Sequence, residues 1–507
     1  MTSSYISYSR ENGGRVLLLF LLFLLALYQL THAGFSSFAI VCLTPLLVIA
    51  IYCAFRWKML AFWILFIVNY LIQMKDISAH LPLPMSLPNE MLQIILLAVA
   101  IIDARENPHF EKAANLMLFA LIIWCGYCTL EVLNDTCNLG INIGSWYQGA
   151  RLMAFQLLYI FLVYSVYISS PEKIMNYLLI WGGLALFSVY WVWKQETFGF
   201  TPTEKIWLET RGRTTHILNA GTLIRYFSTF SDAANYGCNA AATAVAFIVF
   251  AITTKIRKIR IFFIIVSVLV IWGMFQSGTR TAIFCLAAGL MVYVVLSKSV
   301  KIAVPFSIAF IFFAFILIFT NIGQGNQQIR RMRSAFNKDD ASMNVRDMNK
   351  EVMKKYIQDA PWGIGLGMGM DNVPANNKYR KLATIPPDSE YVFIWLRTGP
   401  IGITVFIITM LIMLGGACWT ILFKLKNKSL IGIGGGLCCA FVSIQLGGYA
   451  NQVLMQFPNC LIFYGGLSIV YILPYLEPAW IEFENKQLAE QEEKKRLKLE
   501  KKLASRV

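Results

Sequence analysis

The sequence predicts an all-α polytopic membrane protein with about 14 transmembrane helices and a large polar loop late in the chain. Of its 507 residues, 57% are hydrophobic and only 14% are charged, whereas a soluble domain carries about 25% charged residues. Apolar runs of about 20 residues recur along the chain, and each is long enough to cross a hydrocarbon layer of ~30 Å. Short basic loops separate several of these runs, as is typical of membrane proteins.

The first apolar run, RVLLLFLLFLLALYQL at 15–30, could be a signal peptide or a membrane helix. No small-residue cleavage site follows it and further apolar runs come at once, so we expect a membrane helix. The predicted spans are 15–31, 36–55, 58–74, 88–103, 113–132, 150–169, 174–193, 233–253, 260–274, 280–297, 302–320, 389–423, 430–450 and 456–475. The twelfth is overlong, so part of it is expected to lie tilted or at the membrane interface.

The short basic loops predict the orientation of these spans. If the N-terminus is cytoplasmic, they all fall on the cytoplasmic side with the tail, as the positive-inside rule requires. These basic segments are 55–58, 254–260, 297–301, 424–428 and 485–507. The outer side then holds two long segments, 194–232 and 321–388. We therefore divide the chain into 1–320 with the first eleven helices and the outer loop 194–232, the large periplasmic loop 321–388, the last three helices at 389–475, and a charged cytoplasmic tail at 476–507.

Charge and cysteine usage narrow the function classes. The net charge of +16 could indicate a nucleic-acid partner, but in a membrane protein basic residues serve topology and contact with anionic lipids instead. The eleven cysteines have no spacing typical of metal ligands, and we interpret them as small buried hydrophobes. We predict membrane lipids as partners, and no nucleic acid, metal or cofactor.

Four polar clusters interrupt the apolar pattern, and all four fall on the predicted outer face. Their charged and amide residues are Arg211, Arg213, His216, Arg225, Asp232 and Asn235 in the first cluster, Arg280 in the second, Arg330, Arg331, Arg333 and Arg346 in the third, and Asp388, Ser389 and Glu390 in the fourth. Several arginines on one face predict a site for a polyanion such as pyrophosphate, because the planar guanidinium donates two parallel hydrogen bonds. A nearby acid could then act as a general base.

Each cluster also has a structural interpretation. Arginines at the ends of spans often reach toward lipid phosphates. The PWGIGLGMG segment at 361–369 could be only a flexible turn, because no Walker-type Lys and Ser/Thr follow it. Asp388 fits a helix N-cap with Glu390 in the first turn, and His216 fits a loop residue better than a ligand. Arg397 lies deep enough in its helix that we expect it to face a wet or protein-lined interior.

The order of these motifs resembles that of the O-antigen ligase and O-antigen polymerase superfamily of bacterial inner-membrane glycosyltransferases. RYFSTFSDAANYG at 225–237 resembles the family's Arg, Gly-Thr-Phe and Asp-Pro-Asn element, with alanine where proline is usual. SGTRTA at 277–282 resembles its Ser-Gly-Ser-Arg segment. NVRDMNKEVMKKYIQDAPWGIGLGMG at 344–369 resembles the arginine-containing helix and the Pro-x-x-Gly-x-Gly-x-Gly turn of its large periplasmic loop. PPDSEYVFIWLRTGPIG at 386–402 resembles the His-Asn-x-x-Leu helix that closes this loop.

The resemblance implies a GT-C-like fold and a multi-pass enzyme of the bacterial inner membrane whose active site faces the periplasm. The donor would be an undecaprenyl-pyrophosphate-linked glycan. The acceptor would be a sugar hydroxyl on a lipid-linked repeat or on lipid A-core, and a chain-length regulator is a further candidate partner. The family's ligases carry histidine where this chain has Asp388 and asparagine where it has Ser389. This departure favours a polymerase over a ligase.

The resemblance also suggests a role for each candidate residue. Arg225, Arg280 and Arg346, with Arg211 and Arg213, would bind the pyrophosphate; Asp388 or Glu390 would act as the base, with Arg280 stabilising the leaving group; and Asp232, Asn235 and Ser389 would contact the acceptor sugar. A transporter or flippase of lipid-linked sugars is the alternative from another class. Transporters usually place polar residues near the bilayer midplane, whereas here these residues concentrate outside the predicted spans.

Overall fold

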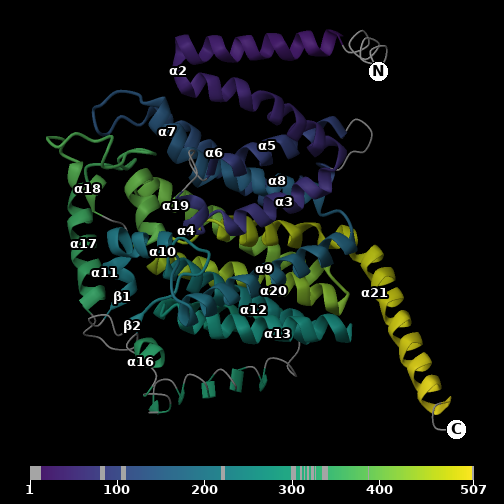
Figure 1. The fold of residues 1–507 in the computed structure, drawn as a ribbon. Coiled ribbons are helices and arrows are strands. Elements are labelled where there is room, and N and C mark those ends of the chain that lie inside the picture. The colour runs from purple at the N-terminus through teal and green to yellow at the C-terminus, as the bar shows by residue number, and fades with distance from the viewer. Residues whose placement is uncertain are drawn as a thin grey trace.

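The computed structural model is a bundle of long helices, with one two-stranded antiparallel sheet among the residues it describes (Figure 1). The described residues are 13–79, 86–103, 110–218, 223–297, 327–333, 341–385 and 388–504, with short fragments between 304 and 325. Helices dominate because a backbone that crosses hydrocarbon must satisfy its own N–H and C=O groups. The prediction of an all-α polytopic membrane protein is confirmed.

The elements follow one another along the chain in this order. The first group is α2 (Gly13–Arg56), α3 (Lys58–Leu71), α4 (Lys75–Ser78), α5 (Ser86–Asp103), η1 (Phe110–Ala113), α6 (Leu116–Leu130), η2 (Glu131–Leu133), α7 (Ile143–Ala150), η3 (Arg151–Phe155), α8 (Gln156–Tyr167) and α9 (Pro171–Thr197). The second is α10 (Pro202–Trp207), η4 (Leu208–Gly212), α11 (Arg213–His216), β1 (Ile217–Leu218), β2 (Leu223–Ile224), α12 (Ala233–Thr253), α13 (Arg257–Gln276) and α14 (Arg280–Leu296). The third is α16 (Gln327–Arg333), α17 (Ala341–Ile357), α18 (Arg380–Thr384), α19 (Glu390–Trp419), η7 (Thr420–Lys424), α20 (Lys428–Ala450), η8 (Cys460–Tyr464) and α21 (Gly465–Ala504).

Within the described residues, nine helical segments are long and apolar enough to cross a membrane, and three shorter apolar helices accompany them. The predicted spans 15–31 and 36–55 both lie in the helical element α2, which folds back near its middle (Figure 1). The predicted span 302–320 lies largely outside the described residues.

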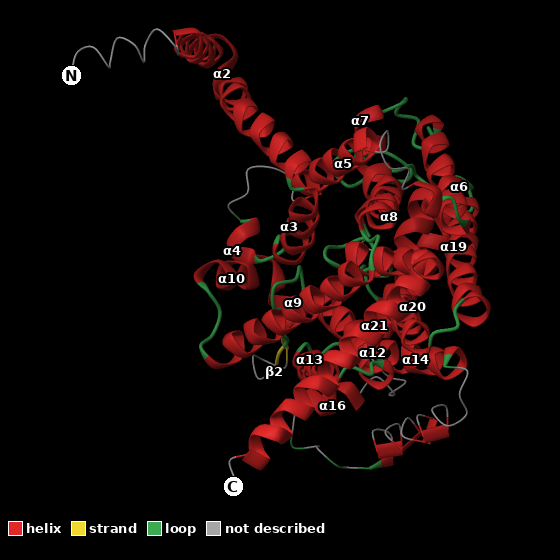
Figure 2. Cartoon of the chain, turned by 90° about the vertical axis from the view of Figure 1, so that its right-hand side faces the viewer, coloured by secondary structure: helices red, strands yellow, loops and turns green. Residues whose placement is uncertain are grey.

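The bundle has two distinct ends (Figure 1). We call one the site end, which holds residues 228–235, 277–280, 388–390 and 451–459. We call the other the tail end, where the loops 254–257 and 424–428 meet the second half of α21. Lys255 forms an ion pair with Glu484 at 2.9 Å there. Both views show that α2 and the last part of α21 project from the bundle (Figure 2).

Helix α12 lies at the centre of the bundle and packs against α13, α14 and α20. Its sequence is rich in alanine, and that of α20 is rich in glycine, so the helix backbones approach closely. A Cβ atom on Gly289 of α14, for example, would lie 2.9 Å from Val245 of α12. Almost every side chain of α12 is buried. The N-terminus of α12 is therefore a rigid platform at the site end.

Helix α19 is broken at Gly399, which has a φ of +67°, and Pro400 follows. Pro400 has no N–H to donate to the carbonyl oxygen of Leu396, four residues earlier. The segment 361–369, which we call the glycine-rich turn, supplies donors at this break. The Ile364 N–H donates to Leu396 O at 2.9 Å, and the Gly365 N–H donates to Arg397 O at 3.0 Å. The turn is thus a backbone clamp on the broken helix. The break also explains why this predicted span is overlong.

Candidate functional site

The N-terminus of α12 is capped twice. Asp232 is the N-cap residue, and its Oδ1 accepts hydrogen bonds from the N–H groups of Ala234 and Asn235 at 2.8 Å each. The N–H of Ala233 donates to His216 Nε2 at 3.0 Å. Because Nε2 accepts, the hydrogen of a neutral His216 lies on Nδ1, where Gly212 O accepts at 3.2 Å. His216 is therefore a structural cap rather than an ordinary loop residue.

The turn Ser277–Gly278–Thr279 joins α13 to α14 and packs directly on this helix start. Thr279 Oγ1 donates to the carbonyl oxygen of Ala233 at 2.7 Å. A Cβ atom on Gly237 of α12 would lie 2.7 Å from Thr279 Cβ, so the contact requires glycine there. Gly278 adopts a φ of +56°, which glycine tolerates without steric cost. We call residues 277–280 the arginine turn, because Arg280 follows as the first residue of α14.

Two further arginines hold the arginine turn from outside. Arg225 donates from Nε to Ser277 O at 3.2 Å and from a terminal nitrogen to Thr279 Oγ1 at 3.1 Å. Arg331 of α16 donates from Nε to Gly278 O at 2.7 Å. Two guanidinium groups therefore lie against the backbone that presents Arg280. The structure thus places Arg225 and Arg331 against the turn from which α14 begins at Arg280.

Lys75 contacts the chain just before the α12 platform. Its Nζ donates to the carbonyl oxygen of Ser231 at 2.6 Å and lies 4.0 Å from the centre of the Trp207 ring. Burial lowers the pKa of Lys75 to about 8, although the carboxylates of Asp232 and Glu204 act in the opposite direction. Lys75 therefore adds positive charge beside Ser231, the residue before the Asp232 cap.

Electrostatics keep His216 neutral. Its burial lowers the pKa to about 4, and the positive charge of Arg225 acts in the same direction. Asp232 opposes this shift, and Lys75 reinforces it. A neutral imidazole is what the cap requires, since a protonated Nε2 cannot accept the Ala233 N–H.

The loop 451–459 connects the α12 platform to the start of α19. On one side, Gln456 Oε1 accepts from the Asn235 amide at 2.9 Å, and Asn459 contacts the same amide. On the other side, the Leu454 N–H donates to Glu390 Oε2 at 3.1 Å. Asn235 and Glu390 are 0% and 3% exposed, so both side chains are used inside the protein. The loop fixes the first and fourth polar clusters relative to each other.

The N-cap of α19 is Ser389, so the interpretation of Asp388 as the cap is wrong. Ser389 Oγ accepts from the Val392 N–H at 3.5 Å and donates to Gly448 O at 3.2 Å. The second bond, to the end of α20, requires a buried side chain at the cap position. The cap is therefore the buried Ser389 and not the exposed Asp388. Asp388 precedes the cap and is exposed at the site end. Its carboxylate is therefore accessible from solution, whereas that of Glu390 is not.

The remaining arginines of the predicted site have no hydrogen bond with the arginine turn among the described side chains. Arg211 and Arg213 are exposed on η4 and α11, and Arg211 is close enough to Lys75 to influence its charge. Arg346 lies in α17, which packs against α19, but its side chain is outside the described residues. Arg397 lies beside the glycine-rich turn and over the ring of Phe393 at 5.3 Å, so it faces protein.

Among the side chains that the structure describes, no group of three or more His, Cys, Asp or Glu residues could hold a metal ion. The charge that would face a substrate at this end is instead that of guanidinium groups. Asp339 and Asp340 lie outside the described residues.

Residues 265–407 match the family model described as O-antigen ligase. Over this segment the chain is similar to the O-antigen ligase and polymerase superfamily. The matched segment begins in α13 and ends in α19, so it contains Arg280, Arg331 and Asp388. This similarity, together with the apolar helices, supports an integral membrane protein and, at a coarse level, an enzyme of a family whose substrates are a lipid-linked glycan and an acceptor. No curated protein matches the chain.

The sequence-based site prediction did not include several residues that the structure places at the site end. Arg331 was one of three clustered arginines, and only the fold shows which of them reaches the arginine turn. Gln456 and Asn459 lie in an ordinary-looking loop between two spans. Lys75 had a usable signal, because a lysine in a short loop on the predicted outer side is unusual under the positive-inside rule.

Proposed function

We propose that this protein is a membrane glycosyltransferase that polymerises undecaprenyl-pyrophosphate-linked repeat units into O-antigen or exopolysaccharide. The site end would face the periplasm of a bacterial inner membrane. The observation that carries the proposal is the arginine turn: Arg225 and Arg331 hold it, Arg280 extends from it, and loop 451–459 connects its platform to the helix that Asp388 precedes.

Arginine chemistry supports a pyrophosphate ligand at this turn. Guanidinium groups remain charged at any ordinary pH and bind phosphate oxygens through paired N–H donors. Arg225 and Arg331 already bind the turn backbone, so we assign them to positioning and assign Arg280 to direct contact. We keep Arg346, Arg211 and Arg213 as secondary pyrophosphate contacts, because α11 and α17 lie at the same end of the bundle as α16 (Figure 1).

In the proposed reaction, the acceptor hydroxyl oxygen attacks the anomeric carbon of the donor glycan. The bond from that carbon to the pyrophosphate oxygen breaks, and undecaprenyl pyrophosphate leaves with the electron pair. Arg280 stabilises the negative charge that develops on the leaving oxygen. The exposed carboxylate of Asp388 accepts the hydroxyl proton. Glu390 is the second candidate for the base, and its burial against Leu454 makes it the weaker one.

We assign supporting roles to the three residues predicted to contact the acceptor. Asp232 caps α12 through Oδ1, and its Oδ2 lies 2.8 Å from Ser231 Oγ. Asn235 and Ser389 are 0% and 6% exposed, so their side chains have no open surface for a sugar in this conformation. They position the site through the 451–459 loop and the end of α20.

A ligase that transfers the glycan to lipid A-core is the second candidate, because the matched family model is described as O-antigen ligase. Gene deletion separates the two. Single-repeat surface glycans on a gel would support a polymerase, whereas free lipid-linked polymer beside bare lipid A-core would support a ligase. Normal glycans in the deletion strain would contradict both.

The chemistry is tested with purified protein and a synthetic polyprenyl-pyrophosphate repeat unit. Wild type should release polyprenyl pyrophosphate and form longer glycans. Arg280→Lys should lose most of this activity, since lysine keeps the charge but lacks the paired donors. Arg257→Lys is the matched control, because Arg257 is exposed at the tail end. Full activity of Arg280→Lys would contradict the proposed contact, and translocation of the lipid without glycosidic bond formation would indicate a flippase.

A further inference from the structure

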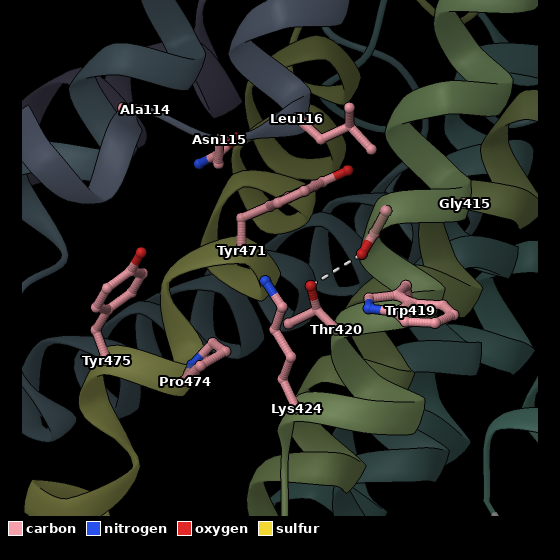
Figure 3. Close-up of a pocket in the computed structure, with 11 residues that line it drawn as sticks. Ala114, Asn115, Leu116, Gly415, Trp419, Thr420, Lys424, Tyr471, Pro474 and Tyr475 are labelled. Carbon is pink, nitrogen blue, oxygen red and sulfur yellow. Dashed lines mark hydrogen bonds between the residues drawn. The ribbon is translucent and has the colours of Figure 1, made fainter.

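A cavity of about 710 Å³ opens at the tail end, far along the bundle from the arginine turn. It lies between the start of α6, the end of α19 with η7, and the first part of α21 (Figure 3). Its lining residues are Ala114, Asn115, Leu116, Gly415, Gly416, Trp419, Thr420, Lys424, Tyr471, Pro474 and Tyr475. The volume is within the ~300–1,000 Å³ that is typical of small-molecule sites.

The walls of this tail-end cavity are built rather than accidental. A Cβ atom on Gly415 would meet no other atom within 4 Å, so this glycine leaves open space. Tyr471 is fixed across the cavity because its hydroxyl donates to Met413 O at 2.6 Å. Thr420 Oγ1 donates to Gly416 O at 2.9 Å, which fixes this side chain in the cavity wall (Figure 3). Fixed walls around open space indicate a site that a ligand could enter.

One cation points into the cavity. Figure 3 shows the Lys424 amine directed between Tyr471, Pro474 and Thr420. Among the described residues, no carboxylate lies within 4.0 Å of this amine. The neighbouring carboxylate of Glu477 instead accepts the N–H groups of Lys426 and Asn427. The positive end of the α6 dipole, which begins at Leu116, adds to the attraction for an anion.

The rim of the cavity is apolar and faces outward. Leu116, Trp419 and Tyr475 are 46%, 58% and 59% exposed. Single exposed apolar residues are ordinary on a surface that faces lipid, but here they surround a hollow with a cation inside. Tryptophan and tyrosine concentrate where hydrocarbon meets head groups, and lysine at that depth attracts lipid phosphate. A soluble anion would gain nothing from this apolar rim.

We propose that the tail-end cavity binds one anionic glycerophospholipid. Its phosphate would contact Lys424, and one acyl chain would leave the cavity over Leu116 and Trp419. The bound lipid would fill the space between α6, α19 and α21 at the end opposite the arginine turn. It would thereby stabilise the C-terminal part of α19, the helix whose other end follows Asp388.

Native mass spectrometry of the full-length protein in detergent tests this proposal. Phosphatidylglycerol should bind, and phosphatidylcholine of the same chain length should bind more weakly. Lys424→Gln should weaken phosphatidylglycerol binding about fivefold, as expected for one lysine near a lipid phosphate. Lys428→Gln is the matched control, because Lys428 is exposed at the same end and does not line the cavity.

A second variant fills the cavity instead of removing its charge. Gly415→Leu should reduce binding of phosphatidylglycerol without a change in net charge, because its side chain would enter the open space. Equal binding of the two lipids, or unchanged binding in both the Lys424 and the Gly415 variants, would overturn the proposal. Full competition by inorganic phosphate would indicate a soluble-anion site and would overturn it as well. Stronger binding of polyprenyl phosphate than of phosphatidylglycerol would do the same.

Discussion

Replacing Asp388 by asparagine should nearly abolish glycan transfer and leave the stability of the protein unchanged. Replacing Ser389 by alanine should lower the stability and leave most of the transfer activity. The two residues are adjacent, but they have different surroundings. Ser389 caps α19 and is buried, while Asp388 is exposed before the cap. Asparagine keeps the size of aspartate and removes the ability to accept a proton.

The expected magnitudes follow from these contacts. The Ser389→Ala variant loses a long capping bond of 3.5 Å and a bond of 3.2 Å to Gly448 O. We therefore expect its unfolding free energy to fall by about 1 kcal/mol. At Asp388 the unfolding free energy should change by no more than about 0.5 kcal/mol, as for most surface substitutions. The loss of a general base typically lowers the rate by about 10²–10⁴, which raises the activation free energy by roughly 3–5 kcal/mol.

The assay combines initial rates with thermal unfolding of the same purified samples. Release of polyprenyl pyrophosphate reports the rate, and loss of helical signal on heating reports stability in one detergent. Asp371→Asn serves as the matched control, because Asp371 is an exposed acid in the loop before α19. This variant should resemble wild type in both measurements.

A rate for Asp388→Asn within about threefold of wild type would refute its assignment as the base, since base loss costs at least about 10². The search would then move to Glu390 and Asp232. A variant that lost activity only in proportion to its stability would refute the assignment as well. Complementation of a deletion strain at matched protein level gives an independent readout, in which Asp388→Asn should yield short glycans and Ser389→Ala normal ones.

Four further predictions concern stability, metal and orientation. The neutral His216 cap has a pKa of about 4, below the usual 6.5, so its stabilisation is complete above pH 6.5 and is lost as the pH falls toward 4. The melting temperature of wild type should therefore drop between pH 7 and pH 5 by more than that of His216→Gln, and equal drops would contradict this. Gly363→Ala should expose the loop before α19 to protease, because Gly363 has a φ of +73° and its Cβ would lie 2.5 Å from the helix backbone; Gly126→Ala, where a Cβ meets nothing within 4 Å, should not. A chelator should leave transfer unchanged, and a loss that Mg²⁺ or Mn²⁺ restores would show that a metal is needed. A cysteine at Ala375 should be labelled from outside the inner membrane and one at Lys426 only after lysis, and the opposite pattern would place the arginine turn in the cytoplasm.

Hydropathy predicted the helical bundle well because membrane spans are a property of composition over a window of about 20 residues. The helices α12, α13 and α20 coincide with predicted spans to within a few residues. The two spans placed at 15–31 and 36–55 belong to one helical element, α2, that folds back near its middle (Figure 1), because hydropathy registers a linker but does not show whether its backbone remains helical.

The position of the α19 cap could not be predicted because Asp and Ser are both favoured at N-caps. The local sequence Pro-Asp-Ser-Glu is compatible with either choice. The decision comes from Gly448, 59 residues away in the chain, whose carbonyl oxygen accepts from Ser389 Oγ. Asn235 is similar: its partners Gln456 and Asn459 are more than 200 residues away, and no local pattern indicates them.

The arginine turn shows why counting basic residues is insufficient to locate a phosphate site. The sequence offered many arginines on one face, and each has the same chemistry. Packing separates them, since Arg225 and Arg331 donate to backbone oxygens of the turn while Arg280 opens the following helix. The buried hydroxyl of Thr279 ties the turn to Ala233 O, and the two arginines add donors to the backbone oxygens that remain. Together these contacts hold the start of α14, and with it Arg280, at a constant place on the α12 platform.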